Sequence, residues 1–175
     1  MCGIAGIVDG ENRLTYRNPQ AVEAMMQTMK RRGPDQQHTY TDASVTLLHA
    51  RLSVMDIEHG IQPMQLKGNP RYIIVYNGEL YNTEELRREL KEKGYSFQET
   101  SDTEVLLQAF IEWKENVVEK LNGIFAFAVW DNKERRLFMA RDRMGVKPLF
   151  YTLQDGAMIF ASEIKTLLAH PCIDP

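Results

Sequence analysis

The segment GIFAFAVW (residues 123–130) constrains the fold more than any other part of this sequence. Its side chains are apolar at odd and even positions alike, so a strand formed here has two apolar faces. Such a strand is stable where both of its faces are covered, as they are inside layered sheets. The segment therefore predicts a sheet that is packed on both sides by other parts of the chain.

Shorter segments with strand character lie on both sides of this run. Asp155-Gly156 is a strong hairpin signal, and short strands joined by tight turns favour antiparallel pairing. Asn77-Gly78 is also a turn signal, and we expect it to end the strand before it. The segments with strand character are residues 3–8, 45–52, 72–76, 137–140, 149–151 and 158–161.

Helix signals separate these strands. Asn18-Pro19 predicts a helix start, and Asn82 and Ser101 each precede a glutamate by three positions, which is capping-box spacing. A short helix is expected over residues 163–169. The first helix carries an apolar stripe that we expect in the core, formed by Val22, Met25, Met26 and Met29. The order of elements predicts an α+β fold in which two antiparallel sheets carry helices on their outer faces.

The composition is that of a single globular domain spanning residues 1–175, with 43% hydrophobic and 26% charged residues. A net charge of -3 argues against nucleic acid or a membrane surface as a partner. No apolar stretch approaches the ~18 residues of a membrane span, and no basic region marks a secretory signal. Cys2 and Cys172 lack zinc spacing, so we expect no metal, and a reducing cytoplasm would keep Cys2 a thiol.

Cys2 carries the most specific chemical prediction. Removal of Met1 would leave a thiol and a free α-amine on one residue. The amine has an unperturbed pKa of about 7.7–8.0, so it can accept a proton near neutral pH. A nucleophile with its own base needs no catalytic histidine. The alternative is a small apolar residue at the start of a strand.

Asn77 and Gly78 have the chemistry of an oxyanion hole. The side-chain amide and the glycine N–H could converge on a negatively charged oxygen, and glycine lets the main chain approach closely. The alternative is a plain hairpin turn.

Three further polar residues are candidates for binding or catalysis. Arg51 could clamp a carboxylate with both arms of its guanidinium, or simply be an exposed arginine at a strand end. Asp102 could receive an ammonium, although a carboxylate at a helix start is favoured by the helix dipole alone. His49 could form a papain-like pair with Cys2, or be a packed, hydrogen-bonded histidine.

Eight short motifs taken together resemble the class II glutamine amidotransferase domain, an N-terminal-nucleophile hydrolase. They are MCGIAGIV at 1–8, RGPD at 32–35, RLS at 51–53, NGELYN at 77–82, SDTE at 101–104, GIFAFA at 123–128, RDRMGVKPL at 141–149 and SEIK at 162–165. They occur in this order over nearly the whole chain, and they are most similar to the N-terminal half of glutamine-hydrolysing asparagine synthetases.

The resemblance implies a four-layer αββα sandwich and a role for each matching position. Cys2 would attack glutamine, and Asn77 with Gly78 would hold the oxyanion. Arg51 would bind the α-carboxylate of glutamine, and Asp102 with Glu79 would bind its α-ammonium. The pocket would also be lined by main-chain groups of Leu52, Ser53, Val54 and Met55.

The resemblance also implies a reaction and partners. This domain would hydrolyse glutamine to glutamate and ammonia through a γ-glutamyl thioester on Cys2, without a cofactor. ATP and magnesium would be needed only by a synthetase domain that accepts the ammonia. Its S-G-G-x-D-S loop does not occur in these 175 residues, so we expect the glutaminase part alone. Arg31 replaces the histidine that often precedes R-G-P-D, and no role is assigned to that position. The sequence does not decide whether the chain forms a homodimer.

Other functions remain open at this point. The chain could be the glutaminase part of another class II amidotransferase, although R-G-P-D with R-L-S favours asparagine synthetase. It could be a catalytically silent module that only binds glutamine. A thiol hydrolase that uses Cys2 and His49 is the third alternative.

Overall fold

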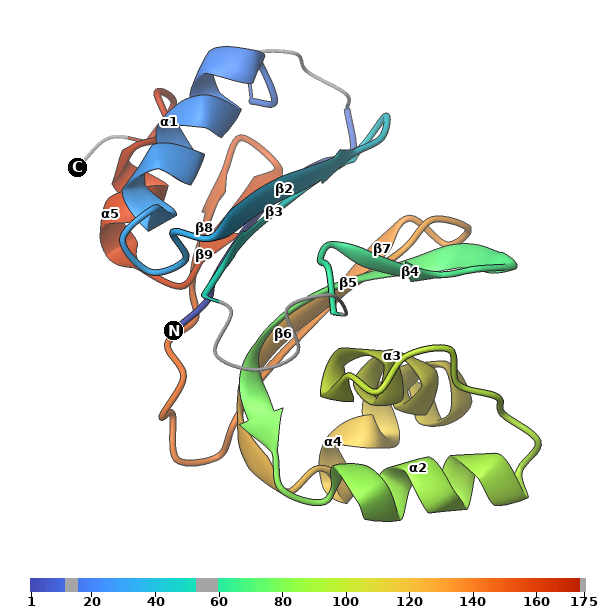
Figure 1. The fold of residues 1–175 in the computed structure, drawn as a ribbon. Helices are drawn as coiled ribbons and strands as arrows, with labels where there is room; N and C mark the ends of the chain where they lie inside the picture. The colour runs from blue at the N-terminus through green and yellow to red at the C-terminus, as the bar shows by residue number, and fades with distance from the viewer. Residues whose placement is uncertain (12–15, 53–59, 174–175) are drawn as a thin grey trace.

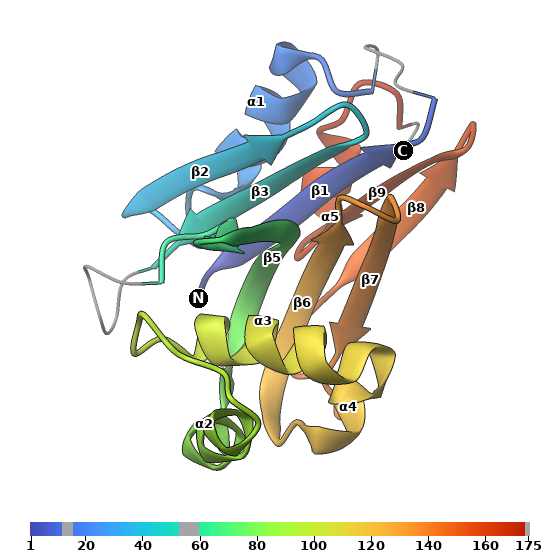
Figure 2. The same ribbon diagram turned by 90° about the vertical axis from the view of Figure 1, so that its right-hand side faces the viewer.

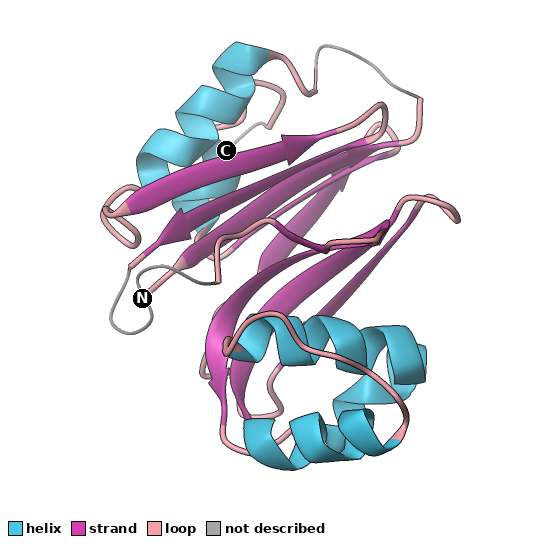
Figure 3. Cartoon of the chain, turned by 45° about the vertical axis from the view of Figure 1, so that its right-hand side comes forward, coloured by secondary structure: helices cyan, strands magenta, loops and turns pink. Residues whose placement is uncertain are grey.

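The computed structural model describes residues 1–11, 16–52 and 60–173. Two antiparallel sheets lie face to face, with α1 and α5 outside one sheet and α2, α3 and α4 outside the other (Figures 1 and 3). This confirms the predicted α+β, four-layer αββα sandwich. None of the helices in the described part of the chain has the length and apolar character that a membrane crossing requires.

The first sheet has the strand order β2-β3-β1-β9-β8, and the second has the order β4-β5-β6-β7. Every pairing between neighbouring strands is antiparallel. The strands of the first sheet are β2 (Gln36–Thr41), β3 (Val45–Arg51), β1 (Gly3–Asp9), β9 (Ala157–Ala161) and β8 (Phe150–Gln154). Those of the second are β4 (Met64–Leu66), β5 (Asn69–Leu80), β6 (Gly123–Asp131) and β7 (Arg136–Arg141).

The helices cover the two outer faces. The first sheet is covered by α1 (Pro19–Met29) and α5 (Ile164–Leu168), and the second by α2 (Thr83–Glu92), α3 (Asp102–Trp113) and α4 (Val117–Lys120). A 3-10 turn, η1 (Lys114–Asn116), joins α3 to α4. The methionine stripe of α1 lies in the core as predicted, because Met25 and Met29 are fully buried beneath the helix.

Strand β6 has the two covered faces that its sequence predicts. One face, with Phe125, Phe127 and Val129, packs in the cluster beneath α3. The other, with Ala126, Ala128 and Trp130, packs in the cluster between the sheets. This strand therefore contributes to two apolar layers at once.

Asn77-Gly78 does not end a strand, contrary to the sequence prediction. Strand β5 continues to Leu80, and Asn77 and Gly78 pair with Ala126 and Phe125 of β6. A two-residue hairpin of this type needs positive φ at its central positions, and neither residue has it. The cross-strand partner, which lies nearly fifty residues away, overrides the local turn signal.

Local signals also failed elsewhere. Strands β2 and β4 and the turn of α4 were not predicted; β2 is a half-exposed polar strand and β4 has three residues. Asn82 precedes α2, but its side chain bonds the main chain of Lys120 and Asn122 in place of its own helix. Ser101 does cap α3, since its hydroxyl accepts from Glu104 N at 3.3 Å.

Candidate active site

Cys2 stands at the start of β1, at the end of the sandwich where β3 and β5 finish. Side chains alternate along a strand, so Cys2 shares a face with Ile4, which lies in the cluster between the sheets. The sulfur is half-buried, and its contact is the main-chain oxygen of Leu52 at 3.9 Å. The sequence-predicted nucleophile and Leu52 are therefore neighbours.

Arg51 lies at the end of β3, on the same inner face. Gly3 pairs with Ala50, so one further step of this register sets Cys2 opposite Arg51. Neighbours of this kind have Cβ atoms about 4.5–5.5 Å apart. Arg51 is 8% exposed, and its Nη1 donates to Gln36 Oε1 at 3.1 Å. Arg51 is thus a buried residue on the strand next to Cys2, not an exposed strand-end arginine.

Asn77 approaches the same place from the second sheet. Strand β5 contacts both β1 and β3 across the sandwich. Ile73 and Val75 lie in the layer between the sheets, so by alternation Asn77 also points inward. It is 3% exposed, and among the described residues its side-chain nitrogen has no hydrogen-bond partner. A buried donor without an acceptor is costly, at about 1–3 kcal/mol, and such groups often mark functional sites.

Gly78 has a packing reason to be glycine. A Cβ on this residue would lie 2.5 Å from the carbonyl oxygen of Ile124 and 2.8 Å from Phe125 Cα. No side chain fits there without moving β6. The main chain of β5 can therefore approach β6 closely. Glycine also has no side chain of its own to cover the Gly78 N–H, which is the predicted oxyanion donor.

Asp102 is joined to the second sheet through a residue that sequence reasoning missed. It occupies the first turn of α3, and its Oδ2 accepts from the Tyr76 hydroxyl at 2.8 Å. Burial raises the pKa of Asp102, and the bonds from Tyr76 and from the Leu80 main chain oppose the shift. Burial also holds the pKa of Tyr76 well above its usual value, and the charges of Asp102, Glu79 and Cys2 add to this effect. Cys2, Glu79 and Asp102 therefore all act on one phenol.

The other predicted binding residues lie in different situations. Glu79 is exposed near the end of β5, on the same side of the strand as Asn77. Ser53, Val54 and Met55 lie outside the described residues. The structure thus brings together Cys2, Arg51, Leu52 and Asn77 at one end of the sandwich, with Asp102 hydrogen-bonded to Tyr76.

Arg32 belongs to the site, although sequence reasoning gave it no role. Its Nε donates to the main-chain oxygen of Cys2 at 3.0 Å, and its Nη1 lies 4.0 Å from Glu163 Oε1. The next residue, Gly33, packs so tightly on β3 that a Cβ would lie 2.1 Å from the Ala50 carbonyl carbon. The R-G-P-D motif was the available signal, because its arginine holds the main chain of Cys2.

His49 does not pair with Cys2. It is 1% exposed on the inner face of β3, and within the described residues neither ring nitrogen has a hydrogen-bond partner. Burial is the main reason why the pKa of His49 falls to about 3. A neutral, very weakly basic imidazole is a poor base for a thiol, which disfavours the papain-like alternative.

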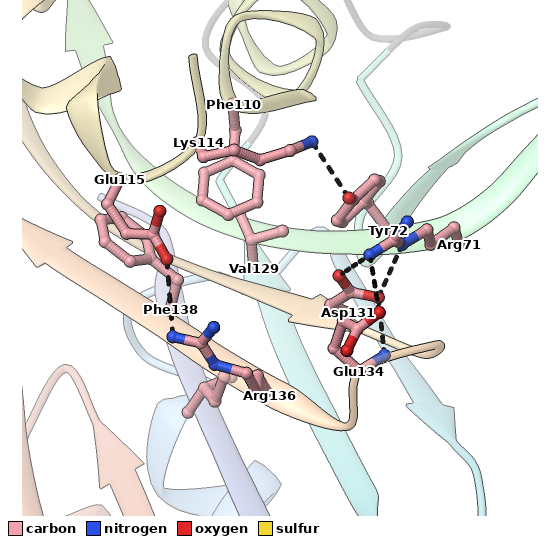
Figure 4. A pocket seen from close by; sticks show the side chains of 11 residues that line it. Arg71, Tyr72, Phe110, Lys114, Glu115, Val129, Asp131, Glu134, Arg136 and Phe138 are labelled. Atoms are coloured by element: carbon pink, nitrogen blue, oxygen red, sulfur yellow. Dashed lines mark hydrogen bonds and ion pairs between the residues drawn. The ribbon is translucent and has the colours of Figure 1, made fainter. Parts of the chain in front are cut away.

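A large surface cavity lies away from these residues. It has a volume of about 330 Å³ and lies beside α3, β5, β6 and β7, with none of the predicted site residues in its lining (Figure 4). Its charged side chains pair with neighbours, as Arg71 does with Asp131 at 2.6 Å and Arg136 with Glu115 at 3.5 Å. Within the described ranges, no group of three or more His, Cys, Asp or Glu side chains is arranged to hold a metal ion.

The fold and the family that matches this chain define a glutamine amidotransferase domain. Residues 1–175 match the family described as "Glutamine amidotransferase domain", and the chain belongs to this family. It is 54% identical over 175 residues to asparagine synthetase [glutamine-hydrolyzing] 3 of Bacillus subtilis, covering 99% of this chain and 28% of that protein. It is 34% identical to asparagine synthetase B of Escherichia coli, covering 96% of this chain and 30% of that protein. The chain thus spans under a third of the length of these relatives.

A solved structure with low sequence identity to this chain has the same fold. The glutamine phosphoribosylpyrophosphate amidotransferase of Bacillus subtilis superposes with a TM-score of 0.73 at 22% identity. The match covers 96% of this chain and 43% of that one. The sandwich is therefore shared with a distant amidotransferase.

Proposed function

We propose that this domain hydrolyses glutamine to glutamate and ammonia, with Cys2 as the nucleophile. The observation that carries the proposal is the convergence at one end of the sandwich of Cys2, the buried Arg51 and Asn77, whose side-chain nitrogen has no hydrogen-bond partner among the described residues. Membership of the glutamine amidotransferase domain family supports glutamine as the substrate.

The reaction proceeds in two steps. After Met1 is removed, the Cys2 α-amine takes the thiol proton, and the thiolate attacks the side-chain carbonyl carbon of glutamine. Asn77 Nδ2 and the Gly78 N–H stabilise the oxyanion. The C–N bond then breaks, the departing nitrogen receives the proton held by the amine, and ammonia leaves a γ-glutamyl thioester. Water attacks the thioester and releases glutamate and the thiol.

Substrate recognition follows from charge. Arg51 binds the α-carboxylate as a bidentate fork, and Asp102 with Glu79 attracts the α-ammonium. Tyr76 bonds the Asp102 carboxylate at 2.8 Å and so fixes its orientation. Leu52, whose main-chain oxygen lies 3.9 Å from Cys2 Sγ, lines the pocket in this proposal.

The wider assignment is the glutaminase part of an asparagine synthetase. In the complete gene product the ammonia would pass to a synthetase domain, which would use ATP and magnesium to activate aspartate. This domain itself would use no cofactor, and the reaction belongs to a reducing compartment such as the cytoplasm, which preserves the thiol. The names and identities of the curated relatives support this reading.

The test has a chemical and a mass-spectrometric arm. The glutamine analogue 6-diazo-5-oxo-norleucine should alkylate Cys2, and Cys2→Ala should release no glutamate above background. The intact mass should show that Met1 is absent from active protein. Glutamate release by a chain that retains Met1, or by Cys2→Ala, would overturn the mechanism. Glutamine binding without turnover would favour a silent module.

A further inference from the structure

Strand β5 has one open edge along the half that carries Asn77 and Gly78. β6 lies on one side of this half, and no other described strand lies on its other side (Figure 2). Strand β4 begins at Met64, opposite Ile74, and pairs only with the earlier half of β5. Buried main-chain amides on the open edge therefore need partners other than a neighbouring strand.

Three main-chain amides point to this open edge, those of Tyr76, Gly78 and Leu80. The Tyr81 amide donates to Asn122 O, which directly precedes β6, at 2.8 Å. In an antiparallel ladder the amides of successive residues point to opposite edges of the strand. The amides of the even-numbered residues in this part of β5 therefore point away from β6.

The two outer amides of the three are bonded to side chains from other parts of the chain. Tyr76 N donates to Gln62 Oε1 at 2.6 Å, and the Leu80 amide bonds the Asp102 carboxylate. The Gly78 amide between them is the proposed oxyanion donor. The main chain on both sides of this donor is thus held by side-chain hydrogen bonds, and one of them comes from Gln62.

The surroundings of Gln62 orient its carboxamide for this bond. Gln62 is 6% exposed, and its Nε2 donates to Thr103 Oγ1 at 3.2 Å, so its oxygen is the atom that faces Tyr76. Thr103 follows Asp102 in the first turn of α3. Gln62 therefore links the strand of the oxyanion donor to the helix of the proposed ammonium ligand.

The main chain that precedes Gln62 is also held in place. Gly60 N donates to Glu99 Oε2 at 3.0 Å, just before α3. A Cβ on Gly60 would lie 3.7 Å from Arg51 Nη2, so this segment lies beside the proposed carboxylate clamp. Because Gln62 is anchored through its main chain and through Thr103, its bond to β5 constrains the strand.

We propose that Gln62 is a positioning residue of the oxyanion hole. By holding the Tyr76 amide, it sets the position of Asn77 and Gly78, which follow directly in β5. This rests on the proposed function, in which those two residues bind the oxyanion. Misplaced donors weaken binding of the transition state more than binding of glutamine itself, so the effect of Gln62 falls on kcat more than on KM.

Steady-state glutamate release by variants of the complete gene product tests this role. Gln62→Met removes the acceptor at similar volume and should lower kcat by about tenfold or more, with KM within about threefold. Gln108→Met is the matched control, because Gln108 is also a buried glutamine but bonds Ser96 O and Glu104 Oε1. The control should keep kcat within about twofold. If Gln62→Met changed kcat no more than the control, the proposal would be overturned.

Gln62→Glu separates hydrogen bonding from packing. A glutamate keeps an acceptor for the Tyr76 amide, and the Thr103 hydroxyl can donate to it. This variant should therefore keep kcat within about threefold of wild type. Equal losses of kcat in folded Gln62→Met and Gln62→Glu would show that the acceptor is not what matters, which also overturns the proposal.

Hydrogen exchange reports the same bond without turnover. The Tyr76 amide should exchange at least about tenfold faster in Gln62→Met than in wild type, and at the wild-type rate in Gln108→Met. Unchanged exchange in Gln62→Met would show that Gln62 does not hold β5. A wild type that releases no glutamate contradicts the proposed function instead, and the exchange rate still shows whether Gln62 holds the strand.

Discussion

The layer between the two sheets has polar side chains at both of its ends, and the two ends differ in how these side chains are hydrogen-bonded. At the far end, Trp130 Nε1 donates to Asp42 Oδ2 at 3.0 Å and to Asn132 Oδ1 at 2.7 Å. Asn132 Nδ2 in turn donates to the Tyr40 hydroxyl at 3.0 Å. At the end near Cys2, the Asn77 amide and both His49 nitrogens lack partners among the described residues.

This difference in hydrogen bonding distinguishes an end that stabilises the fold from an end that can bind a ligand. A buried polar group that is fully hydrogen-bonded stabilises a unique packing, whereas an unsatisfied one costs free energy in the empty protein. At the far end, the Trp130 and Asn132 side chains are hydrogen-bonded within the protein. The Cys2 end leaves donors for an incoming ligand, which is the arrangement that transition-state stabilisation requires.

Asn77→Ala is expected to have the largest effect. Removing one oxyanion donor typically lowers kcat by about 10²–10³, and here it also removes an unsatisfied buried group. Steady-state glutamate release should therefore show a large fall in kcat while the denaturation midpoint stays the same or rises. A variant that loses stability but keeps kcat would make Asn77 a structural residue and erase the contrast between the ends.

Arg51→Lys should act mainly on substrate affinity. A lysine keeps the positive charge but loses the planar fork, so KM for glutamine should rise by about tenfold or more, with a smaller change in kcat. Matched titrations with glutamine and with glutamine methyl ester check this. The KM for the ester should differ little between wild type and variant, because the ester has no α-carboxylate. An equal rise in KM for both substrates would show that Arg51 does not bind the carboxylate.

These two residues also show where sequence reasoning succeeds and where it stops. The strand that carries His49 and Arg51 was predicted from its own residues, and β6 was predicted from its two apolar faces, because both patterns are local. Asn77-Gly78 was assigned to a turn because its ladder partner lies on β6, far along the chain.

Contacts between distant segments were the main source of error. Arg32 reaches the Cys2 carbonyl across 30 positions, and Tyr76 reaches Asp102 across 26. No periodicity or spacing encodes either bond. Strand β2 was missed for a different reason: as a half-exposed edge strand it has no apolar alternation to detect.

His49 predicts a pH dependence of stability that belongs to the Cys2 end. Its pKa is about 3 in the folded protein and 6.5 as the ordinary value, so the unfolded chain binds more protons between these limits. Stability is therefore lost as pH falls below about 6.5, by about 2 kcal/mol between pH 7 and pH 5. Urea unfolding of wild type and His49→Leu at both pH values measures the difference, which should be about 2 kcal/mol smaller in the variant. His170, whose pKa is also lowered by burial, contributes to the pH dependence in both proteins. An equal pH dependence in both proteins would show that His49 is not buried in its neutral form.

Asn132→Ala should have the smallest effect and the opposite character to Asn77→Ala. It removes the bonds to Trp130 and Tyr40, while Trp130 keeps Asp42 as an acceptor, so the free energy of unfolding should fall by only about 1 kcal/mol. Glutamate release should be unchanged at temperatures where the variant is folded. Urea unfolding and steady-state kinetics on the same preparation separate the two quantities.

Because both substitutions remove a side-chain amide from the inner layer, Asn132→Ala is the matched control for Asn77→Ala. If it lowered kcat by tenfold or more without unfolding the protein, the far end would also serve catalysis, and self-satisfied hydrogen bonds would no longer distinguish the stabilising end from the catalytic one.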